Sequence, residues 1–418
     1  MKIVDVTVTP IAFGDPPLLN STGVHEPLVL RCVVQLHLED GTVGLGECPG
    51  GRTETERLRA AADAVRGLDV FATGRARHAV HDALRAGTSP VETSRVEERD
   101  SAWSPLEVAM LDAQGKLTGR SVSDLLGGAV RDAVPYSGYL FYKWAEHPPL
   151  DGRPALADEW GAALDPDGLV DQARRMIDLY GFGSLKLKGG VFPPDQEIAA
   201  VRALAAAFPG LPLRIDPNAA WSVETSRRVA RELTGVLEYL EDPTPGIAGM
   251  GEVARSADMP LATNMIVSNV EHVRPAVRHD AVQVLLLDHH LWGGLRRSRE
   301  LAVLCEALGI GLSMHSNSHL GISLAAMTHL AATVPELTYA CDTHYPWNAE
   351  HDVVKPGALR FAQGSVRVPT GPGLGVELDH EALDRLHRAY LESGRERRDD
   401  TAYMRRVDPA YDPGLPRW

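Results

Sequence analysis

The strongest constraint on the fold is a polar residue that recurs at the end of one short apolar run after another. The steps between these residues are 23 to 28 positions long, and helix-like stretches such as residues 168–179 and 197–208 lie between them. The recurring residues are Lys188, Asp216, Glu241, Asn264, Asp288, His315 and then Asp342 or His344. Such a step is typical of successive βα units. With the run GYLFY around Tyr139 as a first strand, the pattern predicts eight strands, the number in a (β/α)₈ barrel.

A doubly wound open sheet is the alternative architecture for the same alternation. The lack of a glycine-rich phosphate loop in this half of the sequence weakens that alternative. The barrel is expected to cover residues 133–365. A C-terminal segment, residues 366–418, begins with turn-rich sequence and includes a helix-like run, and we expect it to pack on the first domain or on the barrel mouth.

The first 132 residues combine strand and helix signals in separate blocks, which predicts an α+β domain. Residues 1–13 alternate, and residues 30–47 give two alternating runs joined at Asp40-Gly41, a hairpin signal. Residues 14–27 have the composition of a mobile surface segment. Further on, Ser104, Pro105 and Glu107 have the spacing of a capping box with a first-turn proline, which predicts a helix that begins there.

Composition excludes several classes of partner. The chain has 418 residues, 44% of them apolar, and a formal net charge of −14, so neither nucleic acid nor an anionic membrane surface is an expected partner. The four cysteines are scattered and predict reduced, packed thiols. No signal-peptide layout and no apolar run of membrane-spanning length is visible, and we expect a cytoplasmic protein.

The stretch SLKLKGG, residues 184–190, places two lysines on one face of a strand. Side chains at i and i+2 share a face, so Lys186 and Lys188 point one way and Leu185 and Leu187 the other. An exposed edge strand would explain this pattern. In a barrel, however, the lysines face the interior near the C-terminal mouth, where they require an anionic partner.

Three consecutive strand ends carry oxygen donors, namely Asp216, Glu241 and Asn264. Neighbouring strand ends lie about 5 Å apart, so these side chains can converge on one hard cation, and Mg²⁺ is the natural occupant. The next two strand ends carry Asp288 and His315. An aspartate beside a histidine fixes its tautomer and leaves Nε2 free to act as acid or base.

This order around the barrel predicts a reaction. Lys188 and His315 would lie on opposite sides of the cation, and a lysine near another cation has a depressed pKa suited to a general base. We therefore predict proton abstraction next to a carboxylate, with the metal and Lys186 stabilising the enediolate oxygen. The spacing selects no role for His289, His290 or His319.

At this point the sequence resembles the enolase superfamily, and within it the glucarate dehydratases. The segments that carry the resemblance run along the whole chain: GVHEP, GLGECPGG, LEVAMLDAQGKLTG, SGYLFY, SLKLKGGV, IDPNAAW, EDP, ATNM, LDHHLW, SMHSNSHLGISLA, CDTHY and PGLGVELD. The resemblance implies a (β/α)₇β barrel, whose last helix is replaced by the return of the chain, beneath an α+β capping domain. It implies a D-glucarate (and L-idarate) dehydratase that forms 5-keto-4-deoxyglucarate.

The resemblance also implies residue roles. Lys188 would remove the proton alpha to a carboxylate and Lys186 would help to hold the enediolate. His315, oriented by Asp288, would protonate the departing β-hydroxyl and serve as the base for L-idarate. Mg²⁺ would be held by Asp216, Glu241 or a neighbour of Glu241, and Asn264. The substrate contacts implied are His25, Ser104, Tyr139, Lys186, Asn218, Asn264, Asn317, His344 and Arg398.

Other functions remain open from the sequence. A dehydratase or epimerase for another aldarate or aldonate would share the base, the metal and the His-Asp pair. A Schiff-base aldolase could use either lysine as nucleophile. A catalytically silent relative could bind sugar acids only. In every case the expected partner is a small sugar acid, a diacid for the favoured function, and we expect a homo-oligomer.

Overall fold

The computed structural model describes residues 1–85, 96–150 and 154–418. In these residues eight parallel strands form a barrel. They are β6 (Ala133–Phe141), β9 (Leu185–Lys188), β10 (Leu213–Asp216), β11 (Leu237–Glu241), β12 (Leu261–Thr263), β13 (Val284–Leu287), β14 (Gly311–Met314) and β15 (Cys341–Thr343). Consecutive strands pair from β6 to β14, and β15 pairs with β6. The hydroxyl of Ser313 in β14 donates to the carbonyl of Ala340, just before β15, at 2.9 Å, which closes the barrel.

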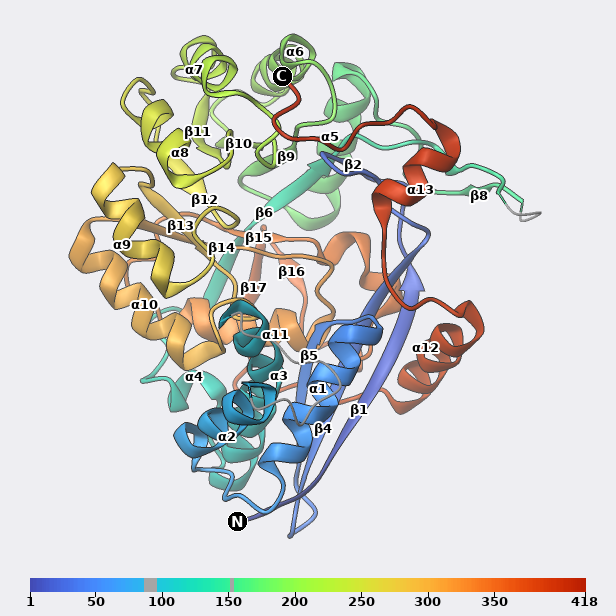
Figure 1. Ribbon diagram of the computed structural model, residues 1–418, viewed down its shortest axis with the longest axis vertical. Coiled ribbons are helices and arrows are strands. Elements are labelled where there is room, and N and C mark those ends of the chain that lie inside the picture. Colours follow the sequence, from blue (N-terminus) through green and yellow to red (C-terminus); the bar gives the residue numbers. More distant parts are fainter. Residues whose placement is uncertain (86–95, 151–153) are drawn as a thin grey trace.

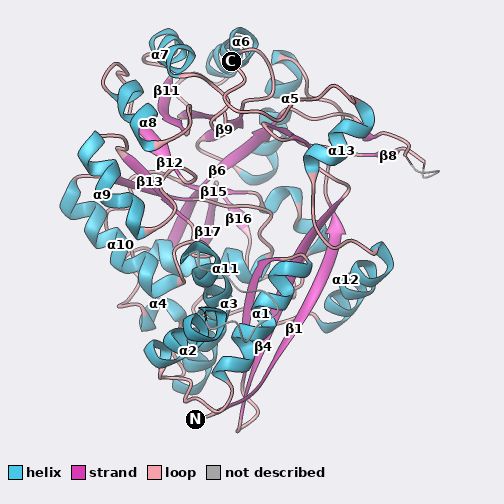
Figure 2. Ribbon diagram, in the orientation of Figure 1, coloured by secondary structure: helices cyan, strands magenta, loops and turns pink. Residues whose placement is uncertain are grey.

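Helices alternate with these strands and form the outer ring (Figures 1 and 2). They are α5 (Pro166–Tyr180), α6 (Pro194–Ala207), α7 (Val223–Glu232), α8 (Ile247–Ala254), α9 (Val270–His279), α10 (Leu295–Leu308) and α11 (Gly321–Ala332). After β15, the described chain forms two short 3₁₀ turns, Tyr345–Trp347 and Ala349–His351, where an eighth helix would follow in a regular barrel. The predicted (β/α)₇β architecture is therefore confirmed, and the open sheet is excluded.

The N-terminal part forms the predicted α+β cap. An antiparallel sheet joins β1 (Ile3–Gly14), β4 (Leu28–Leu38) and β5 (Val43–Pro49), with β4 in the centre. The helices that follow are α1 (Arg52–Val65), α2 (Thr73–Arg85), α3 (Val96–Thr118) and α4 (Val122–Leu125). Strand β5 lies directly on α3, because a Cβ atom at Gly46 would come within 2.1 Å of the carbonyl oxygen of Pro105.

Two sequence predictions in the cap are wrong. Helix α3 does not begin at Ser104 but runs from Val96, with Pro105 inside it. The capping signal fails because its side chains face the barrel: the Ser104 hydroxyl donates to the carbonyl of His289, and the Glu107 carboxylate accepts from the backbone N–H of Leu295 at 2.5 Å. Residues 14–27, expected as a surface segment, form the hairpin β2 (Leu19–Asn20) and β3 (Gly23–Val24), and much of this segment is buried.

A buried charge pair joins the cap to the barrel. Arg31 of β4 contacts Glu47 of β5, with 2.5 Å between Nε and Oε1, and both side chains are almost fully buried. The Glu47 carboxylate accepts the backbone N–H groups of Leu320 and Ser323 at the start of α11, at 2.9 and 2.8 Å. Arg31 donates to the carbonyl of Asn317 at 3.2 Å. The cap therefore holds the loop between β14 and α11 directly.

The C-terminal segment returns to the cap and then crosses to the barrel mouth (Figure 1). Strands β16 (Phe361–Ala362) and β17 (Ser365–Arg367) extend the barrel sheet antiparallel to β6. Helix α12 (His380–Ser393) packs beside the cap sheet: His387 Nδ1 lies 2.7 Å from the carbonyl oxygen of Pro10 in β1. After α13 (Asp400–Val407), the Arg417 guanidinium donates to Ser21 in the cap, and its backbone N–H donates to Ala220 in the barrel.

No helix within the described ranges is both long and apolar enough to cross a lipid bilayer.

Candidate functional site

The predicted residues lie at one end of the barrel because each falls at the carboxyl end of a parallel strand. Lys188, Asp216 and Glu241 are the last residues of β9, β10 and β11. Asn264, Asp288 and His315 follow β12, β13 and β14 by one position each. The regular intervals in the sequence therefore identified the strand ends correctly. This end of the barrel is the expected place for a site.

Both lysines of SLKLKGG face the barrel interior, so the edge-strand interpretation is wrong. Strand β9 pairs with β6 on one side and β10 on the other, and Leu185 and Leu187 are buried in the core. Lys186 is fully buried; its Nζ lies 2.6 Å from Glu241 Oε2 and 2.7 Å from Asp342 Oδ2. Lys188 Nζ lies 2.5 Å from Asp216 Oδ2. The lysines thus meet the anionic partners that burial requires.

The barrel mouth carries more negative than positive charge. Its buried carboxylates are Asp216, Glu241, Asp242 and Asp342, and its ammonium groups are Lys186 and Lys188. One oxygen each of Asp216, Glu241 and Asp242 lies within 4.8 Å of the others. With the Arg214 guanidinium, which lies 3.5 Å from Asp342, three positive groups face four carboxylates, so negative charge remains in excess and a divalent cation would offset it. The donor set of carboxylate oxygens suits Mg²⁺.

The amide of Asn264 lies between the carboxylates of Glu241 and Asp242 and the imidazole of His315. Its nitrogen can donate to Glu241 Oε1 and to Asp242 Oδ2, at 3.1 Å each, while its oxygen accepts from His315 Nε2 at 3.2 Å. In the opposite orientation the amide would offer its oxygen to a cation held by the carboxylates. Asn264 thus joins the acidic cluster to His315.

Glu241 is better placed than its neighbour Asp242 to bind a metal. The Asp242 carboxylate already accepts from the hydroxyl of Thr263 at 2.5 Å and from the backbone N–H groups of Asn264 and Met265 at 3.0 and 3.1 Å. Glu241 Oε2 makes no hydrogen bond of normal geometry among the described residues. Asp242 therefore organises the loop that carries Asn264. Sequence reasoning missed this role, although the EDP motif contained the residue.

His315 and Asp288 form the predicted pair, with 3.0 Å between Nδ1 and Oδ2. Burial acts to raise the pKa of Asp288, but the charge of His290 and hydrogen bonds from His290 and His315 lower it well below its usual range. The carboxylate is therefore ionised and can only accept, so Nδ1 of His315 carries a proton. Nε2 is left facing Asn264. His290, to which the spacing assigned no role, contacts the other oxygen of Asp288 at 2.9 Å.

A second group of predicted residues gathers beside the lysines. The ring of Tyr139 lies 4.9 Å from Lys186 Nζ, and the ring centroids of Tyr139 and His344 are 6.1 Å apart. His344 lies 6.2 Å from His25, also between ring centroids. Burial lowers the pKa of His344 to about 3, which keeps it neutral. Tyr139, His344 and His25 thus form a continuous wall from the barrel to the cap.

His25 and Arg398 are joined through Asp15, a residue that the sequence did not single out. Asp15 Oδ2 lies 3.0 Å from His25 Nδ1 and 2.9 Å from Arg398 Nη1. Burial acts to raise the pKa of Asp15, yet the charges of His25 and Arg398 outweigh burial and lower it. Asp15 therefore fixes the imidazole of His25 and the guanidinium of Arg398, from distant parts of the sequence, at one point.

The other predicted contacts are less closely grouped. Asn218 follows Asp216 in a left-handed conformation (φ 50°), and its buried Oδ1 has no partner among the described residues. Asn317 is exposed on the loop after His315. The hydroxyl of Ser104 is committed to the carbonyl of His289 at 2.8 Å. The structure thus brings Asn218 and Asn317 to the mouth, whereas it places Ser104 at the joint between cap and barrel.

The expected depression of the Lys188 pKa is not found in the chain by itself. Burial acts to lower this pKa, but the carboxylate of Asp216 raises it above the ordinary value. The pKa is raised because the negative charge of Asp216 stabilises the Lys188 ammonium when no cation interacts with the same carboxylate. A neutral Lys188 requires that Asp216 be occupied elsewhere.

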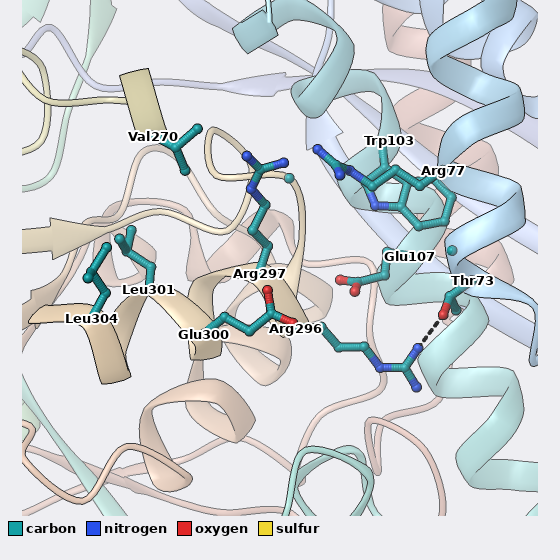
Figure 3. A pocket seen from close by; sticks show the side chains of 12 residues that line it. Thr73, Arg77, Trp103, Glu107, Val270, Arg296, Arg297, Glu300, Leu301 and Leu304 are labelled. Carbon is teal, nitrogen blue, oxygen red and sulfur yellow. Dashed lines mark hydrogen bonds between the residues drawn. The ribbon is translucent and has the colours of Figure 1, made fainter. Parts of the chain in front are cut away.

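A separate cleft of about 580 Å³ lies between the cap and the barrel, away from the strand ends (Figure 3). Thr73, Arg77, Trp103 and Glu107 line it from α2 and α3, and Arg296 lines it from α10. Two of its arginines already have partners: Arg77 contacts Asp100 at 2.8 Å, and Arg296 donates to the hydroxyl of Thr73 at 2.5 Å. None of the predicted site residues lines this cleft, and we place the candidate site at the strand ends instead.

A closed parallel barrel, an acidic cluster with lysines at its carboxyl end, and an α+β cap together define a class of barrel enzymes. Comparison with known families agrees: residues 168–382 match the family Enolase C-terminal domain-like, and residues 4–127 match the Mandelate racemase / muconate lactonizing enzyme, N-terminal domain. The chain is therefore an enzyme of the enolase superfamily, and the resemblance drawn from the sequence is confirmed.

Individual relatives cover the whole chain. It is 52% identical to "Probable glucarate dehydratase" of Streptomyces coelicolor, with 100% of this chain and 99% of the relative aligned. A crystal structure of an enolase from Mycobacterium smegmatis complexed with tartrate is 60% identical, with a TM-score of 0.95 over 100% of this chain and 98% of that one. An enolase from Pseudomonas fluorescens with bound magnesium, potassium and tartrate is 47% identical, with a TM-score of 0.95 over 100% and 99%.

Proposed function

We propose that this enzyme dehydrates D-glucarate, and L-idarate, to 5-keto-4-deoxyglucarate in a Mg²⁺-dependent reaction. The observation that carries the proposal is the mouth of the barrel itself: Lys188 contacts Asp216 on one side of the acidic cluster, and His315 approaches Asn264 on the other. A base and an acid can thus reach a sugar acid from two sides. The full-length similarity to a probable glucarate dehydratase supports the choice of substrate.

The metal would be held by Asp216, Glu241 and Asn264, and when bound it would supply positive charge beside the substrate carboxylate. Neutral Lys188 takes the proton from the carbon next to that carboxylate. The Lys186 ammonium lies where it can stabilise the charge that develops on the carboxylate oxygens. His315 Nε2 then gives a proton to the neighbouring hydroxyl as its C–O bond breaks, and water leaves. The enol that remains rearranges to the keto acid.

The far end of the substrate carries a second carboxylate, and the hydrogen-bond donors of His25 and Arg398 beside Asp15 would bind it. His25 lies on the cap and Arg398 on the C-terminal segment, so the distal carboxylate would be bound by residues outside the barrel. The two solved relatives with tartrate contain a shorter diacid, which is consistent with a site for two carboxylates. Recognition at both ends would favour an aldarate over an aldonate.

The test is a screen of all hexaric acids with Mg²⁺, in which the 2-keto product is trapped with semicarbazide. We expect turnover of D-glucarate, and a loss of about a thousandfold or more in kcat for Lys188→Ala and His315→Ala, since each removes a proton-transfer group. Lys355→Ala, which removes an exposed lysine paired with Glu377, is the matched control and should retain activity.

Other results of the screen would point elsewhere. Epimerisation without keto acid would contradict a dehydratase and favour an epimerase on the same scaffold. EDTA-resistant activity with borohydride trapping of a lysine would favour a Schiff-base aldolase. Thermal stabilisation by hexarates without turnover would favour a silent binding protein.

A further inference from the structure

The carboxylate of Asp288 is held on both of its oxygens. Oδ2 meets His315 Nδ1 at 3.0 Å, whereas Oδ1 meets His290 twice, through ring Nδ1 at 2.9 Å and through the backbone N–H at 2.9 Å. Asp288 and His290 are 5% and 3% exposed, so water cannot easily replace these contacts. The carboxylate therefore cannot turn away from His315 without losing its bonds to His290.

The other nitrogen of His290 reaches the cap. Its Nε2 lies 3.1 Å from the carbonyl oxygen of Glu47 in β5 and 3.1 Å from the hydroxyl of Ser323 in α11. Because the ionised Asp288 carboxylate can only accept hydrogen bonds, Nδ1 of His290 must carry the proton of the bond between them. The ring is thus held through both of its nitrogens. One contacts Asp288, just after barrel strand β13, and the other lies at the joint where the Arg31–Glu47 pair contacts the start of α11.

We propose that His290 is a positioning residue for the Asp288–His315 pair. It clamps one carboxylate oxygen so that the other stays on Nδ1 of His315, and this keeps Nε2 of His315 as the working nitrogen. The anchor for this clamp is the Ser323 hydroxyl of α11, which accepts from Arg31 of the cap and can donate to Nε2 when the proton of His290 is on Nδ1. The inference rests on the proposed function for its kinetic test, since it assigns to His290 the orientation of the group that moves a proton.

The surroundings of His290 argue against a second metal site at this position. Asp288, His290 and His319 each offer a ligand atom within 4.8 Å of the others. However, Asp288 Oδ1 and His290 Nδ1 already bond to each other, and Oδ2 is committed to His315. A cation here would break the pair that the reaction uses. His289 stacks on His290 with 4.0 Å between ring centroids but has no contact with Asp288 among those the structure describes.

Three variants at position 290 separate positioning from packing. His290→Asn places an amide N–H near the position of Nδ1 and can still hold Asp288, whereas His290→Gln reaches toward Glu47, and His290→Leu retains bulk without any donor. We expect His290→Leu to lower kcat for D-glucarate about a hundredfold with little change in KM, because the lost orientation affects a group that acts in the proton transfer. His290→Asn should recover most of this loss and His290→Gln should not. His289→Asn is the matched control and should keep wild-type kcat.

Deuterium exchange separates a positioning role of His290 from a purely structural one, because a structural role would not change the exchange of the two substrates differently. In D₂O, exchange of the α-proton of D-glucarate depends on Lys188, and exchange of the α-proton of L-idarate depends on His315. We expect His290→Leu to preserve the first and to reduce the second about tenfold or more. Equal losses with both substrates, or wild-type kcat in His290→Leu, would overturn the proposal. So would one equivalent of tightly held Zn²⁺ that is lost in His319→Gln.

A spectroscopic arm keeps the inference separate from the proposed function. In protein labelled with ¹⁵N-histidine, the His315 signals, assigned by their loss in His315→Gln, should show the Nδ1–H tautomer in the wild type and a mixture in His290→Leu. If no hexaric acid is dehydrated but the tautomer shifts as stated, the function fails and the positioning role stands. An unchanged tautomer overturns the positioning role whatever the substrate.

Discussion

Adjacent residues of the EDP motif do different work. Glu241 ends β11 and pairs with the Lys186 ammonium at the acidic cluster, with 2.6 Å between Nζ and Oε2, while Asp242, with φ 36°, turns its carboxylate to the backbone of the next loop. A left-handed backbone at an aspartate is costly and is maintained only when its contacts compensate. The four groups that donate to Asp242 provide that compensation: the Thr263 hydroxyl and the backbone N–H groups of Asn264, Met265 and Ile266.

This division of roles gives a prediction for two isosteric changes. Glu241→Gln should weaken Mg²⁺ binding by tenfold or more, because it removes a charged ligand but no loop contact. Asp242→Asn should lower the melting temperature by a few degrees, because an amide can accept on one side only: the N–H groups of Asn264 and Met265 donate to Oδ2, whereas the Thr263 hydroxyl and the Ile266 N–H donate to Oδ1. Isothermal titration with Mg²⁺ and thermal unfolding would check both. A larger loss of stability in Glu241→Gln than in Asp242→Asn would contradict the assignment.

The residues that the sequence identified share a recognisable place, the end of an apolar run. Lys188, Asp216 and His315 could be found because strand phase and strand spacing are local properties. Asp15 and His290 could not, since their partners lie in distant segments and nothing in the local pattern distinguishes them from ordinary polar residues. The raised pKa of Lys188 could not be predicted from the sequence either, because it depends on which carboxylate lies beside the ammonium group in the fold.

At the scale of elements, the contact between β5 and α3 decides how the cap is built. Glycine is required at position 46, where an added Cβ would lie 2.1 Å from the carbonyl oxygen of Pro105. We expect Gly46→Ala to lower the free energy of unfolding by about 3 kcal/mol, as overpacking against backbone does. Gly74→Ala in α2, where an added Cβ has nothing within 4 Å, is the control and should be neutral or slightly stabilising. Chemical denaturation would measure both.

Helix α11 contains a histidine that should make the protein sensitive to acid. His329 accepts the backbone N–H of Ser123 on Nδ1 at 3.3 Å, and its Nε2 lies 3.1 Å from the carbonyl of Leu374. Burial lowers its pKa to about 4, against about 6.5 when unfolded. The unfolded chain therefore binds more protons between these values. Stability is unaffected above pH 6.5 and is lost as pH falls toward 4, by about 3 kcal/mol in total.

The measurement compares melting temperatures of the wild type and His329→Gln at pH 7.5 and pH 5. The variant should be less stable at pH 7.5, because Ser123 loses its acceptor, and the difference should shrink or reverse at pH 5. A difference that stays constant with pH would show that His329 does not titrate in this range.

The eight-stranded barrel and the α+β first domain were predictable because hydrophobic periodicity repeats along the chain, whereas the missing last helix and the capping position of the first domain were implied only by the resemblance to the enolase superfamily. The capping signal at Ser104 misled because the same residue types serve contacts between domains as well as helix termini: Ser104 binds the carbonyl of His289 in the loop after β13, and Glu107 binds the start of α10. Only the tertiary packing of α3 distinguishes the two uses.

On the scale of the whole molecule, the excess negative charge at the barrel mouth links metal binding to stability. Under the proposed function, Mg²⁺ would bind the folded chain and would have no comparable site in the unfolded one, so we expect it to raise the melting temperature in a concentration-dependent way. EDTA should reverse the increase, and the combined substitution Asp216→Asn and Glu241→Gln should abolish it. Na⁺ at equal ionic strength is the control. An equal shift in the double variant would show that Mg²⁺ acts elsewhere.

The buried pair of Arg31 and Glu47 has a consequence for how a substrate passes in and out. Lifting the cap from the barrel would strip the buried Arg31–Glu47 pair of its partners in the barrel, the N–H groups of Leu320 and Ser323, which is costly for a buried carboxylate. We therefore expect the cap to stay docked when a ligand enters or leaves. Residues 14–27 and the last residues of the chain meet where Arg417 donates to the carbonyl of Ser21, and we expect a ligand to pass along this border instead of through the joint at Arg31.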